Sequence, residues 1–316
     1  MSIEYLSCGD TLFDLFVQPN ENPGEINLAG TVGGSPLNVA LGLARLGVKT
    51  GYFAKNSNDL FGRRIRQFLT HNKIDTGFLI SSDRNSTLAV IETKDEGVPD
   101  YAFYTNGTAD RSIDANELPK NLPSTLKVIH VGSYTTATEP TASSLETLVT
   151  ANSASQIISY DPNIRPTIEP DMDIWRTKVA AFSAQAHFVK ASDEDLTLLY
   201  QNPDPQNFAQ DCISRGARLV CVTMGGDGAY AFSADGTSRK MKGVPVTIMD
   251  TVGAGDTFQA SCLYWIGAHG VSSENIAVGI DMEKMLEFAI CAAAITCSRR
   301  GANLPTLAEI EKALAQ

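Results

Sequence analysis

Residues 249–258 read Met249-Asp250-Thr251-Val252-Gly253-Ala254-Gly255-Asp256-Thr257-Phe258, a stretch with two glycines, two carboxylates and two hydroxyl groups in ten residues. The glycine-containing turn leads directly into apolar residues with the spacing of one helix face, namely Phe258, Cys262, Trp265 and Ile266. Free backbone N–H groups and the helix dipole at such an N-terminus favour an anion such as phosphate. Asp256 stands at the same place, where it either caps the helix or takes part in chemistry.

The overall composition indicates an acidic globular protein. The chain has 316 residues, 43% of them hydrophobic, and a formal net charge of −11. Nucleic acid is not expected as a partner, because phosphate backbones are held by clustered Lys and Arg. A nucleotide site in this chain would depend on backbone dipoles, bound cations and a few basic side chains.

The cysteines and the N-terminus indicate the compartment. Six scattered cysteines form neither a CxxC pair nor a Cys/His cluster, so neither a disulfide framework nor a zinc site is expected. The first residues lead into a strand-like run rather than a secretory leader, and no apolar stretch reaches membrane-spanning length. We therefore expect a reduced, cytoplasmic protein with no membrane partner.

A second set of polar residues lies near the N-terminus. The run Ile3–Cys8 predicts a buried strand, and Asp10 and Asp14 follow it. An acid just past the carboxyl end of a first strand is well placed for a ligand in an open α/β sheet, although both could be plain loop acids.

The pair Gly33-Gly34 precedes a helix that the sequence predicts up to Gly47. Ser35 is the expected N-cap and Pro36 the first helical residue. Two glycines allow another molecule to approach the backbone closely, and Asn38 on the first turn could bind hydroxyl groups.

The remaining pattern predicts an α/β fold. From about residue 120 strands and helices alternate, which favours a parallel sheet covered by helices on both faces. Apart from this layer, 15–28, 87–93 and 101–105 are strand-like, and the last two form a predicted hairpin across a polar turn at 94–100. The predicted elements of the alternating part are strands at 127–131, 156–160, 187–190 and 218–223 and helices at 141–152, 173–184, 193–200, 206–215, 282–297 and 307–314.

Four more polar stretches follow predicted strands or cap helices. Arg165 could bind an anion or a sugar oxygen. Three acids in 190–195 either compensate a helix dipole or hold magnesium through water. The glycine-rich turn at 223–230 is a hairpin turn or a phosphate loop, and a basic turn at 298–302 follows the last long helix. Neither GxxxxGK[S/T] nor a GxGxxG after the first strand is present, which excludes a P-loop enzyme and disfavours a dinucleotide fold.

Together these motifs resemble the ribokinase-like, PfkB-type family of sugar kinases. The stretch 250–258 resembles the C-terminal signature of that family, and Gly33-Gly34 with Asn38 and 39–47 resembles its N-terminal signature. The resemblance covers essentially the whole chain and is strongest to bacterial fructokinases, through 103–110, 130–140, 160–165 and 297–302. It implies a ribokinase-like parallel-sheet core in a single domain over 1–316, with a small β-sheet lid from about 12–30 and 86–110.

The resemblance also implies site residues by position. Asp256 would be the general base, and Gly253, Ala254 and Gly255 would supply N–H groups to the transferred phosphate. Substrate-binding residues would be Asp14, Gly33, Gly34, Asn38, Phe103 and Arg165, and nucleotide-binding residues Lys190, Ser192, Thr223, Gly225 and Gly228. Asp250, Val252, Arg299 and Gly301 would belong to a monovalent-cation loop. The usual Asn-x-x-Glu magnesium motif is Ser192-Asp193-Glu194-Asp195 here, so whether Glu194 or Asp195 serves Mg²⁺ through water stays open.

The expected activity is transfer of the ATP γ-phosphate to a sugar hydroxyl, with fructose as the first candidate. Other substrates of the family, 2-keto-3-deoxygluconate, ribose or a nucleoside, stay open, as does a non-catalytic sugar- or nucleotide-binding regulator on the same fold. The expected cofactors are Mg²⁺ and possible K⁺ beside ATP. The resemblance also allows a homodimer through the lid.

Overall fold

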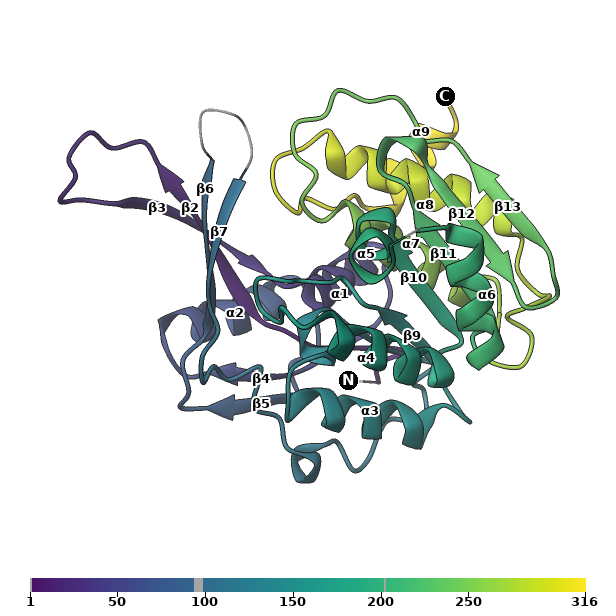
Figure 1. The fold of residues 1–316 in the computed structure, drawn as a ribbon, viewed down its shortest axis with the longest axis horizontal. Helices are drawn as coiled ribbons and strands as arrows, with labels where there is room; N and C mark the ends of the chain where they lie inside the picture. Colours follow the sequence, from purple (N-terminus) through teal and green to yellow (C-terminus); the bar gives the residue numbers. More distant parts are fainter. Residues whose placement is uncertain (1, 94–98, 202) are drawn as a thin grey trace.

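The core of the protein is one large sheet (Figure 1). The computed structural model describes residues 2–93, 99–201 and 203–316. In this part of the chain the sheet comprises β1 (Tyr5–Cys8), β4 (Thr50–Ser57), β5 (Leu79–Ser82), β8 (Val128–Gly132), β9 (Ile157–Asp161), β10 (Phe188–Ser192), β11 (Leu219–Thr223), β12 (Ala229–Ser233) and β13 (Ser238–Met241). The strand order is β13-β12-β11-β10-β9-β8-β1-β4-β5, parallel except at β12 and β13, which run antiparallel to their neighbours. The predicted mainly parallel sheet is confirmed.

Helices cover both faces of this sheet, because its central strands are apolar on both sides. In β8, for example, Val128 packs into the core under α1, α7 and α8, whereas the next residue, Ile129, packs into the core under α3, α4 and α6. The helices are α1 (Ser35–Arg45), α2 (Leu60–His71), α3 (Thr141–Asn152), α4 (Met172–Gln185), α5 (Asp193–Leu199), α6 (Pro205–Arg215), α7 (Ala254–Ala268), α8 (Met282–Cys297) and α9 (Leu307–Leu314).

A small second sheet projects from one end of the body (Figure 1). It consists of β2 (Leu12–Gln18), β3 (Asn27–Gly33), β6 (Thr87–Thr93) and β7 (Pro99–Tyr104), in the order β3-β2-β6-β7. The separate sheet and the hairpin of β6 and β7 are as predicted, although residues 94–98 of the predicted turn lie outside the described residues. Near its base, Phe13 packs on Phe61 of α2 with ring centroids 5.1 Å apart, which anchors the sheet to the body.

The start of α1 differs from the sequence prediction. The N-cap is Gly34, with a φ of 118°, and Ser35 is the first helical residue with its side chain turned elsewhere. A Cβ on Gly34 would come within 2.8 Å of the Asp10 carbonyl oxygen, so the close approach of two backbones requires glycine here. Pro36 is therefore the second helical residue, not the first as predicted, although it still stands in the first turn.

The strand order places the site. β1 pairs in parallel with both β4 and β8, so the chain leaves β1 toward one edge and returns on its other side. Ligands of open α/β sheets bind at the carboxyl ends of strands at such a switch point. Asp10 follows β1 and Ser133 follows β8, and the Ser133 hydroxyl donates to Asp10 Oδ2 at 3.3 Å, so polar groups meet at this point.

All six cysteines are free thiols; five are buried and Cys297 is partly buried. None of the helices within the described residues is both long and apolar enough to cross a bilayer.

Candidate active site

A cavity of about 530 Å³ lies at the carboxyl edge of the large sheet and reaches the small sheet. The predicted site residues that line it are Asp14, Gly34, Asn38, Phe103, Arg165, Lys190, Ser192, Glu194, Asp195, Thr223, Gly225, Val252, Gly253, Gly255 and Asp256. The predicted residues that do not line it are Gly33, Ala254, Gly228, Asp250, Arg299 and Gly301. The structure therefore gathers residues from six predicted motifs, together with Phe103 of the predicted hairpin, around one space.

Asp256 is the central acid of this cavity. It lies in the first turn of α7, directly after Gly253, which adopts a left-handed φ of 79°. Its carboxylate is buried and accepts hydrogen bonds on both oxygens, from Ser35 Oγ at 2.7 Å and from Asn38 Nδ2 at 2.8 Å. Burial raises the pKa of Asp256, and the two donors and the charge of Lys190 oppose that rise. A role for Asp256 as a simple helix cap does not explain these two hydrogen bonds from α1.

Two residues that sequence reasoning missed complete this arrangement. Ser35 was assigned to helix capping, and Asn163 stood between the predicted strand and Arg165 without a role. In the structure Asn163 Nδ2 donates to Ser35 Oγ at 3.0 Å. The available signal was the position of Asn163 directly after β9, at the same sheet edge as the other polar residues.

Acids from the segment between β1 and β4 form another wall of the cavity. Asp14, on β2, has its carboxylate against Gly33, where an added Cβ would overlap Asp14 Oδ2. Burial raises the pKa of Asp14 to about 6. Burial and the nearby charge of Asp110 raise the pKa of Asp10 to about 8, so Asp10 is mostly protonated at neutral pH.

Lys190 lies beneath the glycine turn rather than in open solvent. Its Nζ donates to Asp161 Oδ2 at 2.9 Å, and both side chains are at most 3% exposed. A Cβ on Gly255 would be 3.0 Å from this Nζ, so the ammonium group is immediately adjacent to the turn. Although burial opposes its charge, Asp161 and Asp195 raise the pKa of Lys190.

The start of α5 uses its acids in part for its own structure. Asp195 Oδ2 accepts from the backbone N and Oγ of Ser192, and Asp195 Oδ1 accepts from the backbone N of Ile164. Glu194 is exposed at the cavity. The acids at the start of α5 therefore compensate the helix dipole, and the carboxylates of Glu194 and Asp195 also line the cavity.

The glycine-rich turn after β11 connects antiparallel strands, as one of its two sequence interpretations requires. Gly225 and Gly228 have φ values of 51° and 96°. Thr223 and Gly225 line the cavity, whereas Gly228 packs against the Met241 carbonyl group.

The predicted cation loop is held together by Asp250. Its Oδ1 accepts from Val252 N at 3.0 Å, and its Oδ2 accepts from Gly301 N at 2.8 Å, so the segments before α7 and after α8 are joined. The Arg299 guanidinium points to Glu309 of α9, with Nη2 to Oε1 at 2.6 Å, so the Arg299 side chain does not belong to the loop.

The small sheet and the β9 loop border the mouth of the cavity. Phe103 stacks on Tyr101 with ring centroids 5.9 Å apart, and both line the cavity. Arg165 is exposed there, and its Nη1 donates to the Ile164 carbonyl oxygen at 2.9 Å.

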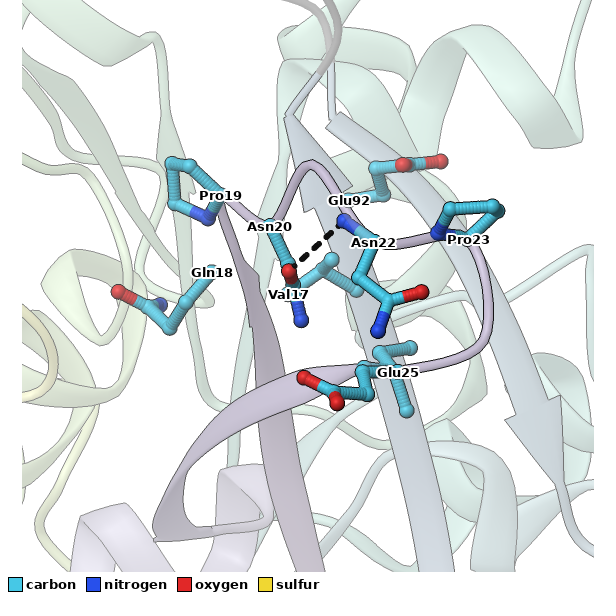
Figure 2. Close-up of a pocket in the computed structure, with 9 residues that line it drawn as sticks. Val17, Gln18, Pro19, Asn20, Asn22, Pro23, Glu25 and Glu92 are labelled. Atoms are coloured by element: carbon cyan, nitrogen blue, oxygen red, sulfur yellow. Dashed lines mark hydrogen bonds between the residues drawn. The ribbon is translucent and has the colours of Figure 1, made fainter.

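A second pocket, of about 460 Å³, lies at the turn between β2 and β3 (Figure 2). Its turn is ordered locally, with Asn22 N donating to Asn20 Oδ1 at 3.0 Å. Its charged residues, Glu25 and Glu92, are exposed, whereas Asp10, Asp195 and Asp256 of the first cavity are buried. We therefore assign the site to the first cavity.

Comparison with known proteins agrees with this geometry. A sequence model of the pfkB family of carbohydrate kinases matches residues 7–309. A fructokinase from Rhizobium leguminosarum bv. trifolii is 35% identical over 283 residues, which are 89% of this chain and 85% of that protein.

Solved structures share the fold. A fructokinase from Xylella fastidiosa with bound ATP has a TM-score of 0.90 at 23% identity, covering 100% of this chain and 99% of that one. A fructokinase double mutant from Vibrio cholerae O395, bound to fructose, ADP and potassium ion, has a TM-score of 0.83 at 24% identity, covering 99% and 98%. At these identities the structures bear on the fold alone. Because the family match extends over nearly the whole sequence, this chain belongs to the pfkB family of carbohydrate kinases.

Proposed function

We propose that this protein is an ATP-dependent fructokinase that converts fructose to fructose 6-phosphate in the cytosol. The observation that carries the proposal is the buried Asp256 carboxylate, held by two donors from the start of α1 beside the Gly253–Gly255 turn. Fructose is favoured among sugars because the Rhizobium relative at 35% identity is a fructokinase.

In the proposed mechanism Asp256 takes the proton of the 6-hydroxyl group of fructose. The hydroxyl oxygen bonds to the γ-phosphorus as the bond from that phosphorus to the bridging oxygen of ADP breaks. The N–H groups of Gly253, Ala254 and Gly255 stabilise the negative charge of the transferred group, since phosphoryl transfer depends mainly on positioning and charge. A positioned base contributes roughly 10²–10⁴-fold to such a rate.

The sugar would lie between Asp256 and the small sheet. Asp14, Gly33, Gly34 and Asn38 would bind its hydroxyl groups, with Phe103 and Arg165 at the cavity mouth. The small sheet would act as a lid, and closing it over the sugar would exclude water as a competing phosphate acceptor.

The nucleotide would occupy the opposite side, where Ser192, Thr223 and Gly225 line the cavity. Gly228 would shape this loop from behind. The Lys190 ammonium group, adjacent to Gly255, would place positive charge near the transferred phosphate.

The acids of α5 fit a magnesium ion held partly by the nucleotide. Glu194 and Asp195 line the cavity, but the described residues include no cluster of three or more His, Cys, Asp or Glu that could form a metal cage. Magnesium usually keeps several waters and binds phosphates with one or two carboxylates. Asp195 is already committed to three hydrogen bonds, so Glu194 is better placed for a water-mediated contact. Bound magnesium would neutralise charge on the phosphates.

A potassium ion fits the loop that Asp250 closes, since carboxylate and backbone carbonyl oxygens are suitable ligands. The Asp250 carboxylate accepts from the backbone N–H groups of Val252 and Gly301, so the ligands of the ion would be the backbone carbonyl oxygens of Val252, Arg299 and Gly301. The Arg299 side chain, paired with Glu309, would take no part. We also propose a homodimer formed through the small sheet, supported by two exposed apolar residues, Leu28 of the edge strand β3 and Ile26 just before it. The mass measured in solution tests the dimer.

An assay of sugar-dependent ATP consumption tests the proposed function. Fructose should give the highest kcat/KM in a panel that also contains ribose, 2-keto-3-deoxygluconate and a nucleoside. A preference for another member would replace fructose and keep the kinase. If no acceptor stimulates ATP consumption, the kinase proposal fails and a sugar- or nucleotide-binding regulator takes its place.

A further inference from the structure

The side chain of Ser35 joins three segments that are far apart in the sequence. It donates to Asp256 Oδ1 at 2.7 Å and accepts from Asn163 Nδ2 at 3.0 Å. These partners lie 221 and 128 residues away along the chain. Ser35 is buried, and Ser35, Asn163 and Asp256 all line the cavity.

The direction of these hydrogen bonds follows from the chemistry of the groups. An amide nitrogen only donates, so Ser35 Oγ accepts from Asn163. A serine hydroxyl has a single proton, which then points to the Asp256 carboxylate, an acceptor when ionised. Asn163 therefore commits the Ser35 proton to Asp256.

The local backbone supports a dedicated role for this chain of donors. Asn163 adopts a left-handed φ of 41°, uncommon for residues other than glycine. Helix capping does not explain Ser35, because the N-cap is Gly34 and both side-chain hydrogen bonds of Ser35 go to other segments.

The surroundings of Asp256 show why a donor matters there. Lys190 and Arg165 favour its charge, whereas burial and the nearby acids Asp14 and Asp161 oppose it. Ser35 and Asn38 donate directly to the Asp256 carboxylate. Hydrogen bonds to a charged acceptor are stronger than those between neutral groups.

We propose that Ser35, oriented by Asn163, is a positioning residue that aims the Asp256 carboxylate at the acceptor hydroxyl and keeps it ionised. This inference rests on the proposed function, in which Asp256 is the base. It adds two residues, Ser35 and Asn163, to the machinery of the reaction.

Replacing Ser35 by alanine tests the inference. Ser35→Ala should lower kcat/KM for fructose roughly 10–100-fold at neutral pH, since one hydrogen bond to a charged group is lost. Removing a donor to the ionised form raises the pKa of Asp256, so the acid limb of the kcat/KM profile should move to higher pH. The loss should therefore be larger at pH 6 than at pH 8.

Three further variants make the result specific. Ser35→Thr keeps the hydroxyl group and should restore most of the loss. Asn163→Gly tolerates the left-handed backbone and should move the acid limb in the same direction by a smaller amount. Ser144→Ala is the matched control, because Ser144 is a buried serine of α3 that donates to Ile113 O at 2.8 Å outside the cavity. Its pH profile should match that of the wild type.

The outcomes separate this inference from the proposed function. An unmoved acid limb in Ser35→Ala, with wild-type kcat/KM, overturns the inference while the kinase stands. A loss that is equal at all pH values, or a Ser35→Thr variant as impaired as alanine, also overturns it. A wild type without kinase activity removes the proposed function itself. Thermal unfolding and ATP binding of each variant verify that the fold is retained.

Discussion

Replacing Lys190 by methionine tests whether the buried pair beneath the glycine turn holds this part of the fold. Lys190 Nζ lies 2.9 Å from Asp161 Oδ2, and the two side chains are 3% and 0% exposed. Methionine has a similar length but no charge, so Asp161 would keep a buried carboxylate without its partner. Breaking such a pair on one side costs about 3–5 kcal/mol. This is a large part of the roughly 5–15 kcal/mol by which proteins are stable.

The expected loss depends on pH in a definite direction. Burial already raises the pKa of Asp161 above that of an unfolded chain, and loss of Lys190 raises it further. A carboxyl group whose folded pKa is raised destabilises the fold above its unfolded pKa, and the penalty disappears when both states are protonated. The difference in unfolding free energy between Lys190→Met and wild type should therefore be larger at pH 8 than at pH 5.

Urea denaturation at both pH values measures this difference. Arg215→Met is the matched control, because Arg215 pairs with Asp211 at 3.0 Å with both side chains more than 40% exposed. Exposed pairs contribute about 0–1 kcal/mol. The double variant Lys190→Met/Asp161→Asn should recover part of the lost stability, because it also removes the unpaired buried charge of Asp161. The buried pair does not hold this part of the fold if Lys190→Met costs no more stability than Arg215→Met, or if its cost falls as the pH rises.

Further predictions concern the cavity itself. Asp256→Asn should lower kcat roughly 10²–10⁴-fold with ATP affinity nearly unchanged in calorimetry, and retained turnover would remove Asp256 as the base. Because burial raises the pKa of Asp14 to about 6, the KM for fructose should increase as the pH falls below about 6, and a flat KM between pH 5 and pH 8 would contradict this role. Gly33→Ala should raise the KM for fructose roughly tenfold or more, since its Cβ would overlap the Asp14 carboxylate, whereas unchanged kinetics would argue against that contact. Gly228→Ala should destabilise the protein by more than ~1 kcal/mol in urea denaturation, because φ is 96° and the Cβ would overlap the Met241 carbonyl oxygen.

Much of the fold could be predicted from local signals in the sequence. The helices Thr141–Asn152 and Met282–Cys297 begin and end at the predicted residues, because apolar periodicity and flanking polar residues report on the helix itself. The β-α alternation predicted a parallel sheet, and the separate strand-like runs predicted the small sheet. The prediction that Ser35 is the N-cap was wrong. A serine at the start of a helix has the same local pattern whether it caps the helix or forms hydrogen bonds with distant segments.

The candidate site could be predicted in its parts but not in its connections. Asp256 and its glycine turn were singled out because a glycine-rich helix N-terminus has a chemical meaning by itself. Lys190 was assigned to the nucleotide, and the sequence contained no sign that Asp161 would be its partner. Arg299 was assigned to the cation loop, and the sequence contained no sign that its guanidinium group would pair with Glu309.

By itself the sequence therefore determined which residue types stand at the ends of strands and helices, since backbone geometry and periodicity are local properties. Only the tertiary structure decided which of these residues touch. Only β8 separates β1 from β9 in the sheet, and α1 packs against α7, so Ser35 reaches Asn163 and Asp256 across 128 and 221 residues of sequence. Such contacts depend on chain topology, and the hydrogen bonds that hold the Asp256 carboxylate exist only once the sheet has assembled.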